Sequence, residues 1–72
     1  MLGYPAKIDP QDGTPPHACT LFDISQTGAK LIAQTTAEIP YEFTLLLGKA
    51  LRRCRVVWKN HRQVGVRFLP PA

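Results

Sequence analysis

Apolar and polar residues alternate with a period of two along much of the chain, which is the pattern of half-buried β-strands. The clearest case is residues 51–58, where alternation places Trp58 on a buried face with Cys54 and Val56. The same alternation places Arg53, Arg55 and Lys59 on a solvated outer face. The pattern predicts six short strands, at residues 5–8, 18–23, 29–34, 42–47, 51–58 and 63–68.

Turn-forming residues separate these apolar segments. Seven prolines and five glycines in 72 residues leave little room for long helices, and most of them fall between the predicted strands. Six short, closely spaced strands favour a barrel, because closure removes exposed strand edges. We therefore expect an all-β fold, a small six-stranded antiparallel β-barrel, with residues 1–72 forming a single domain.

Composition and charge narrow the class of protein. A hydrophobic fraction of 44% is enough for a folded core, and the formal charge of +4 favours an anionic partner. No apolar run approaches the roughly 20 residues of a membrane-spanning helix, so no membrane insertion is expected. Two cysteines without a C-x-x-C spacing are too few for a disulfide framework, which favours a cytoplasmic protein.

The most informative motif is Asp23-Ile-Ser-Gln-Thr-Gly28, between the second and third predicted strands. This segment resembles the D/N-x-S-x-x-G motif of the PilZ family. Arg55-Val-Val-Trp58 together with Val64-Gly-Val-Arg-Phe68 is similar to the closing hairpin of that family. The resemblance implies a six-stranded barrel in bacterial signalling and, as ligand, the second messenger cyclic di-GMP.

The resemblance also implies three ligand-binding residues. A carboxylate at Asp23 accepts hydrogen bonds from the donor edge of guanine, and Ser25 donates to a phosphate or base oxygen. Gly28 lets the backbone approach the ligand closely. The alternative is an ordinary turn in which Asp23 and Ser25 bond the turn backbone and Gly28 adopts a positive φ.

The second half of the family's site is an R-x-x-x-R motif just before the first strand, and this sequence lacks it there. Only Met1-Leu-Gly-Tyr4 precedes Pro5, and the first basic residue is Lys7, within the predicted strand. Lys7 is a candidate auxiliary contact, although an ammonium lacks the planar fork of arginine. We therefore expect a degenerate member with weak or lost cyclic di-GMP binding that acts through protein–protein contacts.

Other classes of function have less support. The basic segment Arg52–Lys59 suggests a barrel that binds single-stranded nucleic acid, which is the alternative function. Four potential zinc ligands match no short ligand spacing, so no metal and no cofactor are expected: His17, Cys19, Cys54 and His61. The two cysteines are expected to be buried and unpaired. No catalytic motif is present, and we do not expect an enzyme.

Overall fold

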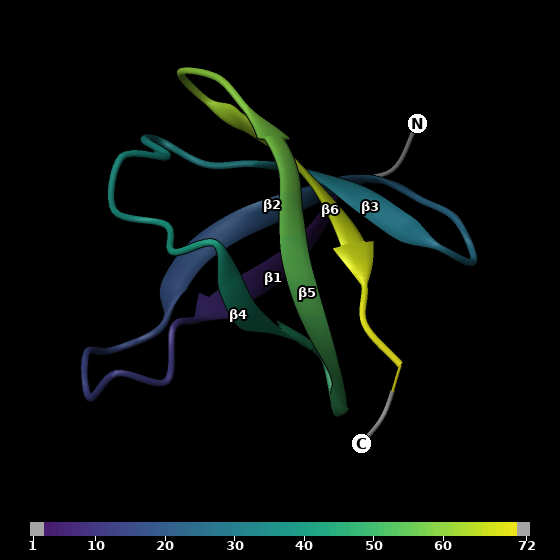
Figure 1. Ribbon diagram of the computed structural model, residues 1–72, viewed down its shortest axis with the longest axis horizontal. Helices are drawn as coiled ribbons and strands as arrows, with labels where there is room; N and C mark the ends of the chain where they lie inside the picture. Colours follow the sequence, from purple (N-terminus) through teal and green to yellow (C-terminus); the bar gives the residue numbers. More distant parts are fainter. Residues whose placement is uncertain (1–2, 71–72) are drawn as a thin grey trace.

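The computed structural model describes residues 3–70, and these residues form six β-strands. The predicted all-β fold is confirmed (Figure 1). No helix within the described residues is long and apolar enough to cross a membrane. The strands are β1 (Tyr4–Asp9), β2 (His17–Ile24), β3 (Gly28–Ile32), β4 (Glu42–Leu47), β5 (Ala50–Lys59) and β6 (Gln63–Phe68).

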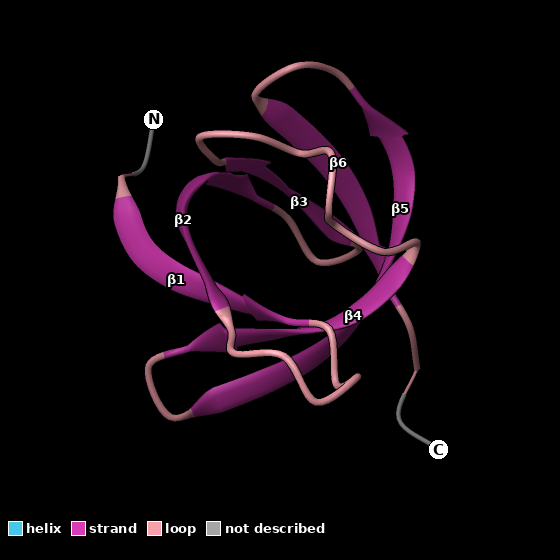
Figure 2. Cartoon of the chain, turned by 90° about the vertical axis from the view of Figure 1, so that its left-hand side faces the viewer, coloured by secondary structure: helices cyan, strands magenta, loops and turns pink. Residues whose placement is uncertain are grey.

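The six strands form a closed antiparallel barrel in the order β1-β2-β3-β6-β5-β4. The circle is completed where β1 pairs with β4, with Ile8 opposite Leu45. Figure 2 shows the strands curving around the barrel and the loops joining them at its ends. Closure leaves no unpaired sheet edge, as the sequence analysis predicted.

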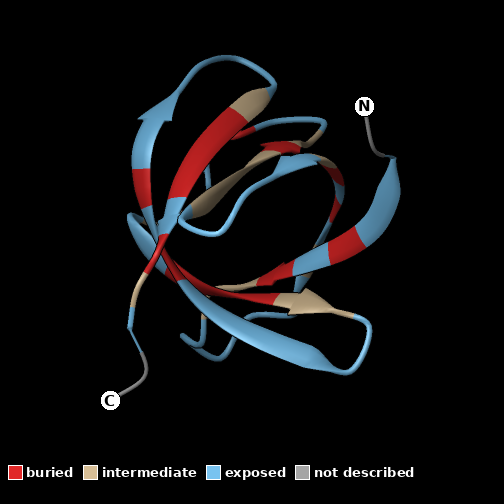
Figure 3. Ribbon diagram, turned by 90° about the vertical axis from the view of Figure 1, so that its right-hand side faces the viewer, coloured by how far each residue is buried: buried red, intermediate tan, exposed pale blue. Residues whose placement is uncertain are grey.

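Burial alternates along β1, β2 and β5, whereas β4 and β6 each contain three consecutive buried residues (Figure 3). The largest fully buried side chains are Phe43, Ile8, Leu21, Leu31, Leu45 and Val64. Cys19 and Cys54 are buried among them and are free thiols, as predicted. Burial raises the pKa of each thiol to about 11.

Two strands contain bulges that interrupt the alternation. In β2 the register shifts between Leu21 and Asp23, and in β5 it shifts between Val56 and Trp58. A bulge adds one unpaired residue and re-aims the side chains that follow it. The prediction of a buried Trp58 is therefore wrong, because the extra residue Val57 turns Trp58 outward, where it is 42% exposed.

The same bulge changes the role of Lys59. The shifted register pairs Lys59 with the buried Val64, at the end of the barrel. Its Nζ donates hydrogen bonds to the carbonyl oxygens of Thr36 (3.1 Å) and Ile39 (2.9 Å) in the loop between β3 and β4. Lys59 thus ties this loop to β5, a role that the sequence did not predict, while the residue stays exposed as expected.

Core packing can be tested at Leu45, which is fully buried beside the β1–β4 seam. Leu45→Ala is expected to lower the free energy of unfolding by about 2–5 kcal/mol, because a cavity replaces buried methyl groups. The matched control is Leu51→Ala in β5, where the side chain is 67% exposed and the expected change is within about 0.5 kcal/mol. Urea denaturation measures both; equal losses would contradict the assigned core.

The buried thiols predict a loss of stability at high pH. The pKa of Cys54 rises from 9.0 to about 11 on folding, so the folded state holds this proton more tightly than the unfolded chain does. The stabilisation is complete below pH 9 and is lost as the pH rises through about 11. Urea unfolding of wild type and Cys54→Ala should give parallel profiles below pH 9 and a steeper fall for wild type above it; parallel profiles throughout would contradict this assignment.

Candidate functional site

The turn between β2 and β3 is organised by Ser25. Its amide donates to the carbonyl oxygen of Gly28 (2.8 Å), and its Oγ accepts hydrogen bonds from the amides of Thr27 (3.3 Å) and Gly28 (3.2 Å). The hydroxyl of Ser25 therefore holds the turn closed, as the ordinary-turn alternative predicted for this residue. The contact between the turn and β6 is completed by the amide of Phe68, which donates to the carbonyl oxygen of Thr27 (2.8 Å).

The carboxylate of Asp23 is anchored by one oxygen only. Its Oδ1 accepts a hydrogen bond from the amide of Ile24 (2.9 Å), and Oδ2 has no hydrogen-bond partner among residues 3–70. The β2 bulge sets the direction of this side chain, because strict alternation from the buried Leu21 would place Asp23 inside the barrel. The bulge instead pairs Asp23 with Lys30 and leaves the carboxylate exposed.

Gly28 is required for close packing against β6. The positive φ that the ordinary-turn alternative expected is absent, since the glycines with positive φ in the described part of the chain are Gly13 and Gly48. A Cβ at Gly28 would collide with the carbonyl oxygen of Val66. Gly28 therefore allows β3 to approach the backbone of β6 closely. Contact between Gly28 and a ligand stays a prediction.

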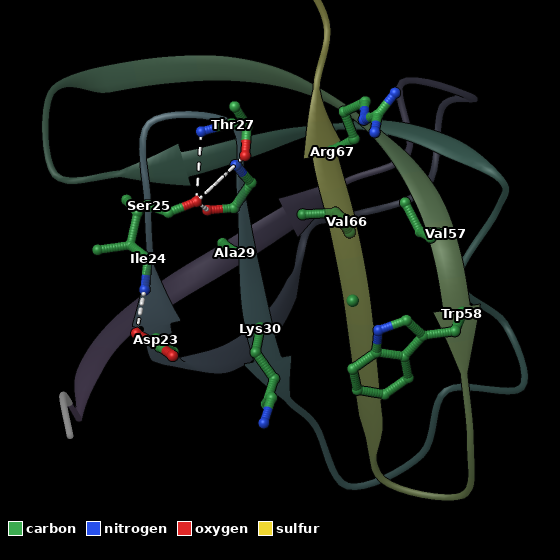
Figure 4. A pocket seen from close by; sticks show the side chains of 12 residues that line it. Asp23, Ile24, Ser25, Thr27, Ala29, Lys30, Val57, Trp58, Val66 and Arg67 are labelled. Atoms are coloured by element: carbon green, nitrogen blue, oxygen red, sulfur yellow. Dashed lines mark hydrogen bonds between the residues drawn. The ribbon is translucent and has the colours of Figure 1, made fainter.

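The three predicted motif residues come together in one open hollow of about 340 Å³, which we call the motif hollow. Asp23 and Lys30 lie on one side of it and Trp58 on the other (Figure 4). The motif hollow is lined by Asp23, Ile24, Ser25, Thr27, Gly28, Ala29, Lys30, Val57, Trp58, Gly65, Val66 and Arg67.

A single row of paired residues explains this arrangement. Asp23 pairs with Lys30, Lys30 with Gly65, and Gly65 with Trp58, across four neighbouring strands. Residues paired across a sheet point to the same face, so this row faces outward. Gly65 has no side chain to fill its place, and the indole of Trp58 lies over it, so that a Cβ there would overlap the ring.

Sequence reasoning missed Trp58, Lys30 and Arg67 as members of this hollow. Gly65 was the one available signal, because glycine inside a strand marks a site where another group approaches closely. Conversely, the structure separates Lys7 from the motif. Lys7 pairs with Ala18 and lines a different hollow with Cys19 and Leu46.

Most of the cations in the basic strand β5 already have protein partners. Arg55 binds Glu42 Oε2 through Nε (3.0 Å) and Nη2 (2.8 Å), and Arg53 Nη2 lies 3.7 Å from Glu42 Oε1. The guanidinium of Arg52 stacks over the ring of Phe68 at 4.1 Å. Arg53 and Arg55 therefore share one carboxylate and Lys59 donates to backbone carbonyl groups, so the positive charge of this strand is partly compensated.

No metal centre is formed by the side chains of residues 3–70. No group of three or more His, Cys, Asp or Glu side chains in this part of the chain is arranged to hold a metal ion. The four potential zinc ligands considered from the sequence are therefore not gathered into a site.

A family model described as PilZ domain matches residues 2–72. The chain belongs to the PilZ domain family. PilZ domains are binding modules of the cyclic di-GMP receptor type, in which the nucleotide is a ligand and not a cofactor. In this PilZ domain the D-x-S-x-x-G motif forms the β2–β3 turn and one wall of the motif hollow. A search of curated proteins found no match.

The position of the indole depends on Gly65 and can be tested by fluorescence. Trp58 is the single tryptophan of the chain, so its emission reports on this ring alone. Gly65→Ala should push the ring off β6, shift the emission to longer wavelength and increase quenching by acrylamide, because the added methyl occupies the position of the indole. Gly3→Ala is the matched control, since a Cβ at Gly3 meets no atom within 4 Å. Unchanged emission from Gly65→Ala would refute the stacked position.

Proposed function

We propose that this PilZ domain is a binding module that captures cyclic di-GMP weakly, through Asp23, Ser25 and Gly28. The observation that carries the proposal is the motif hollow, in which the family motif lies on one side and the exposed ring of Trp58, seated over Gly65, lies on the other. A polar edge opposite an aromatic face suits a nucleobase, which offers both hydrogen-bond donors and a flat apolar surface.

The chemistry of the motif fits guanine. The unpartnered Oδ2 of Asp23 is an acceptor for the donor edge of the base, while Oδ1 keeps the carboxylate oriented. Ser25 keeps its turn bonds as an acceptor, and its hydroxyl proton, which makes only a long bond to the carbonyl oxygen of Gly28 (3.4 Å), can be donated to a ligand oxygen instead. The role of Ser25 in the turn and its role toward a ligand are therefore compatible.

Weak affinity is proposed because no pair of arginines among residues 3–70 lines the motif hollow. Two charge-assisted contacts contribute about 1.5–3 kcal/mol each, and a factor of ten in affinity corresponds to about 1.4 kcal/mol. Loss of both lowers affinity by several orders of magnitude. The open shape of the motif hollow is consistent with this, because a shallow site buries little of its ligand.

We also propose that the domain binds a partner protein through a surface beside the motif hollow. Tyr41 and Val57 are 76% and 63% exposed, and both line a second hollow that adjoins Trp58. Exposed apolar side chains gathered in one place are typical of interaction sites. Free thiols at Cys19 and Cys54 suit action in a reducing compartment such as the cytoplasm.

Nucleic-acid binding is the alternative function, and the charge distribution disfavours it. Arg53 and Arg55 share Glu42, and Lys59 donates to loop carbonyl groups. A basic footprint for a phosphate backbone needs cations that are free to neutralise it.

An amide-resolved NMR titration tests the proposal. Cyclic di-GMP should shift the amides of residues 23–28 together with the indole N–H of Trp58. Asp23→Asn should weaken binding at least about tenfold, because one charge-assisted acceptor is lost. Asp12→Asn removes the same charge from the β1–β2 loop, outside the motif hollow, and should bind as wild type does.

Two results would overturn the proposal. The first is a flat response of wild type to millimolar cyclic di-GMP. The second is an equal loss of affinity for cyclic di-GMP in Asp12→Asn and Asp23→Asn. Shifts at Arg53 and Arg55 on adding a single-stranded oligonucleotide would favour the nucleic-acid alternative instead.

A further inference from the structure

We propose that Lys30 and Arg67 are the phosphate-binding cations of the motif hollow, on the barrel wall. This inference rests on the proposed function and adds to it the residues that meet the charge of the ligand. It also limits the ligand to one with two separated phosphate groups.

The register places both cations on the outward face beside the motif. Lys30 lies between Asp23 and Gly65 in the outward row of paired residues. Arg67 lies two residues further along β6 and pairs directly with Gly28, which has no side chain to cover it. Both side chains therefore border the space that the motif turn encloses.

Lys30 and Arg67 also differ from Arg53 and Arg55 of β5 in having no anionic partner. Neither forms an ion pair with any of residues 3–70, whereas Arg53 and Arg55 share Glu42. The ammonium of Lys30 lies 5.2 Å from the centre of the Phe22 ring, an exposed contact of about 0.5–1 kcal/mol. An incoming anion therefore displaces no ion pair at either cation and at most one weak cation–π contact at Lys30.

An anionic ligand at this site needs such cations. The carboxylate of Asp23 repels phosphate, so a nucleotide that approaches the motif gains only if positive charge lies nearby. Within the lining of the motif hollow, Lys30 and Arg67 are the basic residues, and Lys7 and Arg62 line other hollows.

The arrangement of the two cations selects the shape of the ligand. Lys30 and Arg67 border opposite ends of the motif hollow, and their side chains extend away from each other (Figure 4). A single terminal phosphate can reach one of them. A cyclic dinucleotide carries one phosphodiester on each side of its ring, so its two phosphates match two separated cations.

Calorimetric titration with cyclic di-GMP tests these residues through Lys30→Gln, Arg67→Gln and the control Arg62→Gln. Arg62 lies in the β5–β6 turn, outside the motif hollow, and its substitution removes the same unit of charge. Each of the two site variants should lose at least about tenfold in affinity, and wild type should bind more weakly as salt is raised. The control should stay within about twofold, because distant exposed charges are screened.

A second probe separates this inference from the proposed function. Millimolar inorganic pyrophosphate can bind at each cation separately and, followed by NMR, should shift the amides of Lys30 and Arg67 in wild type and shift neither in the double variant Lys30→Gln/Arg67→Gln. If pyrophosphate binds there and cyclic di-GMP does not, the phosphate contacts stand and the proposed function fails. If cyclic di-GMP binds and the three single variants weaken it equally, the proposed function stands and the phosphate contacts are refuted. No response to either ligand refutes both.

Discussion

Closure of the sheet is the constraint on which the rest of this molecule depends. Six short strands satisfy one another's backbone groups around a complete circle, and the β1–β4 pairing removes the last open edge. Because the interior must be filled by alternate side chains, closure also decides which residues face solvent. The motif turn, the outward row and the cations of β3 and β6 acquire their positions from this register and not from any local preference.

Much of the fold was predictable because it follows from a period of two. The segment Glu42–Leu47 matches its predicted bounds, and buried positions such as Leu21 and Cys54 fall on the predicted faces. The β3 strand ends at Ile32, short of the predicted residue 34, because the amide of Ala33 instead bonds the carbonyl oxygen of Arg62. The bulges were not predictable, since alternation assumes that every residue is paired.

The candidate site was likewise predictable in part. The sequence places Asp23, Ser25 and Gly28 in one turn, and the structure gathers them in one hollow. Trp58 was assigned to the wrong face, because a residue inserted at Val57 leaves no mark on the pattern of apolar positions. The sequence alone also does not show which cations are paired. Arg53 and Arg55 meet Glu42 only through the register of β4 and β5.

The outward row from Asp23 to Trp58 has a consequence for how folding and occupancy are linked. Its members come from four strands and span 43 residues of the sequence, from residue 23 to residue 65. No fragment or partly paired folding intermediate therefore presents the complete surface. A ligand that bridges the row binds the closed barrel and not the open chain, and therefore shifts the folding equilibrium toward closure by mass action. The shift depends on the ratio of ligand concentration to dissociation constant, so a weak ligand stabilises the closed barrel only when its concentration exceeds that constant.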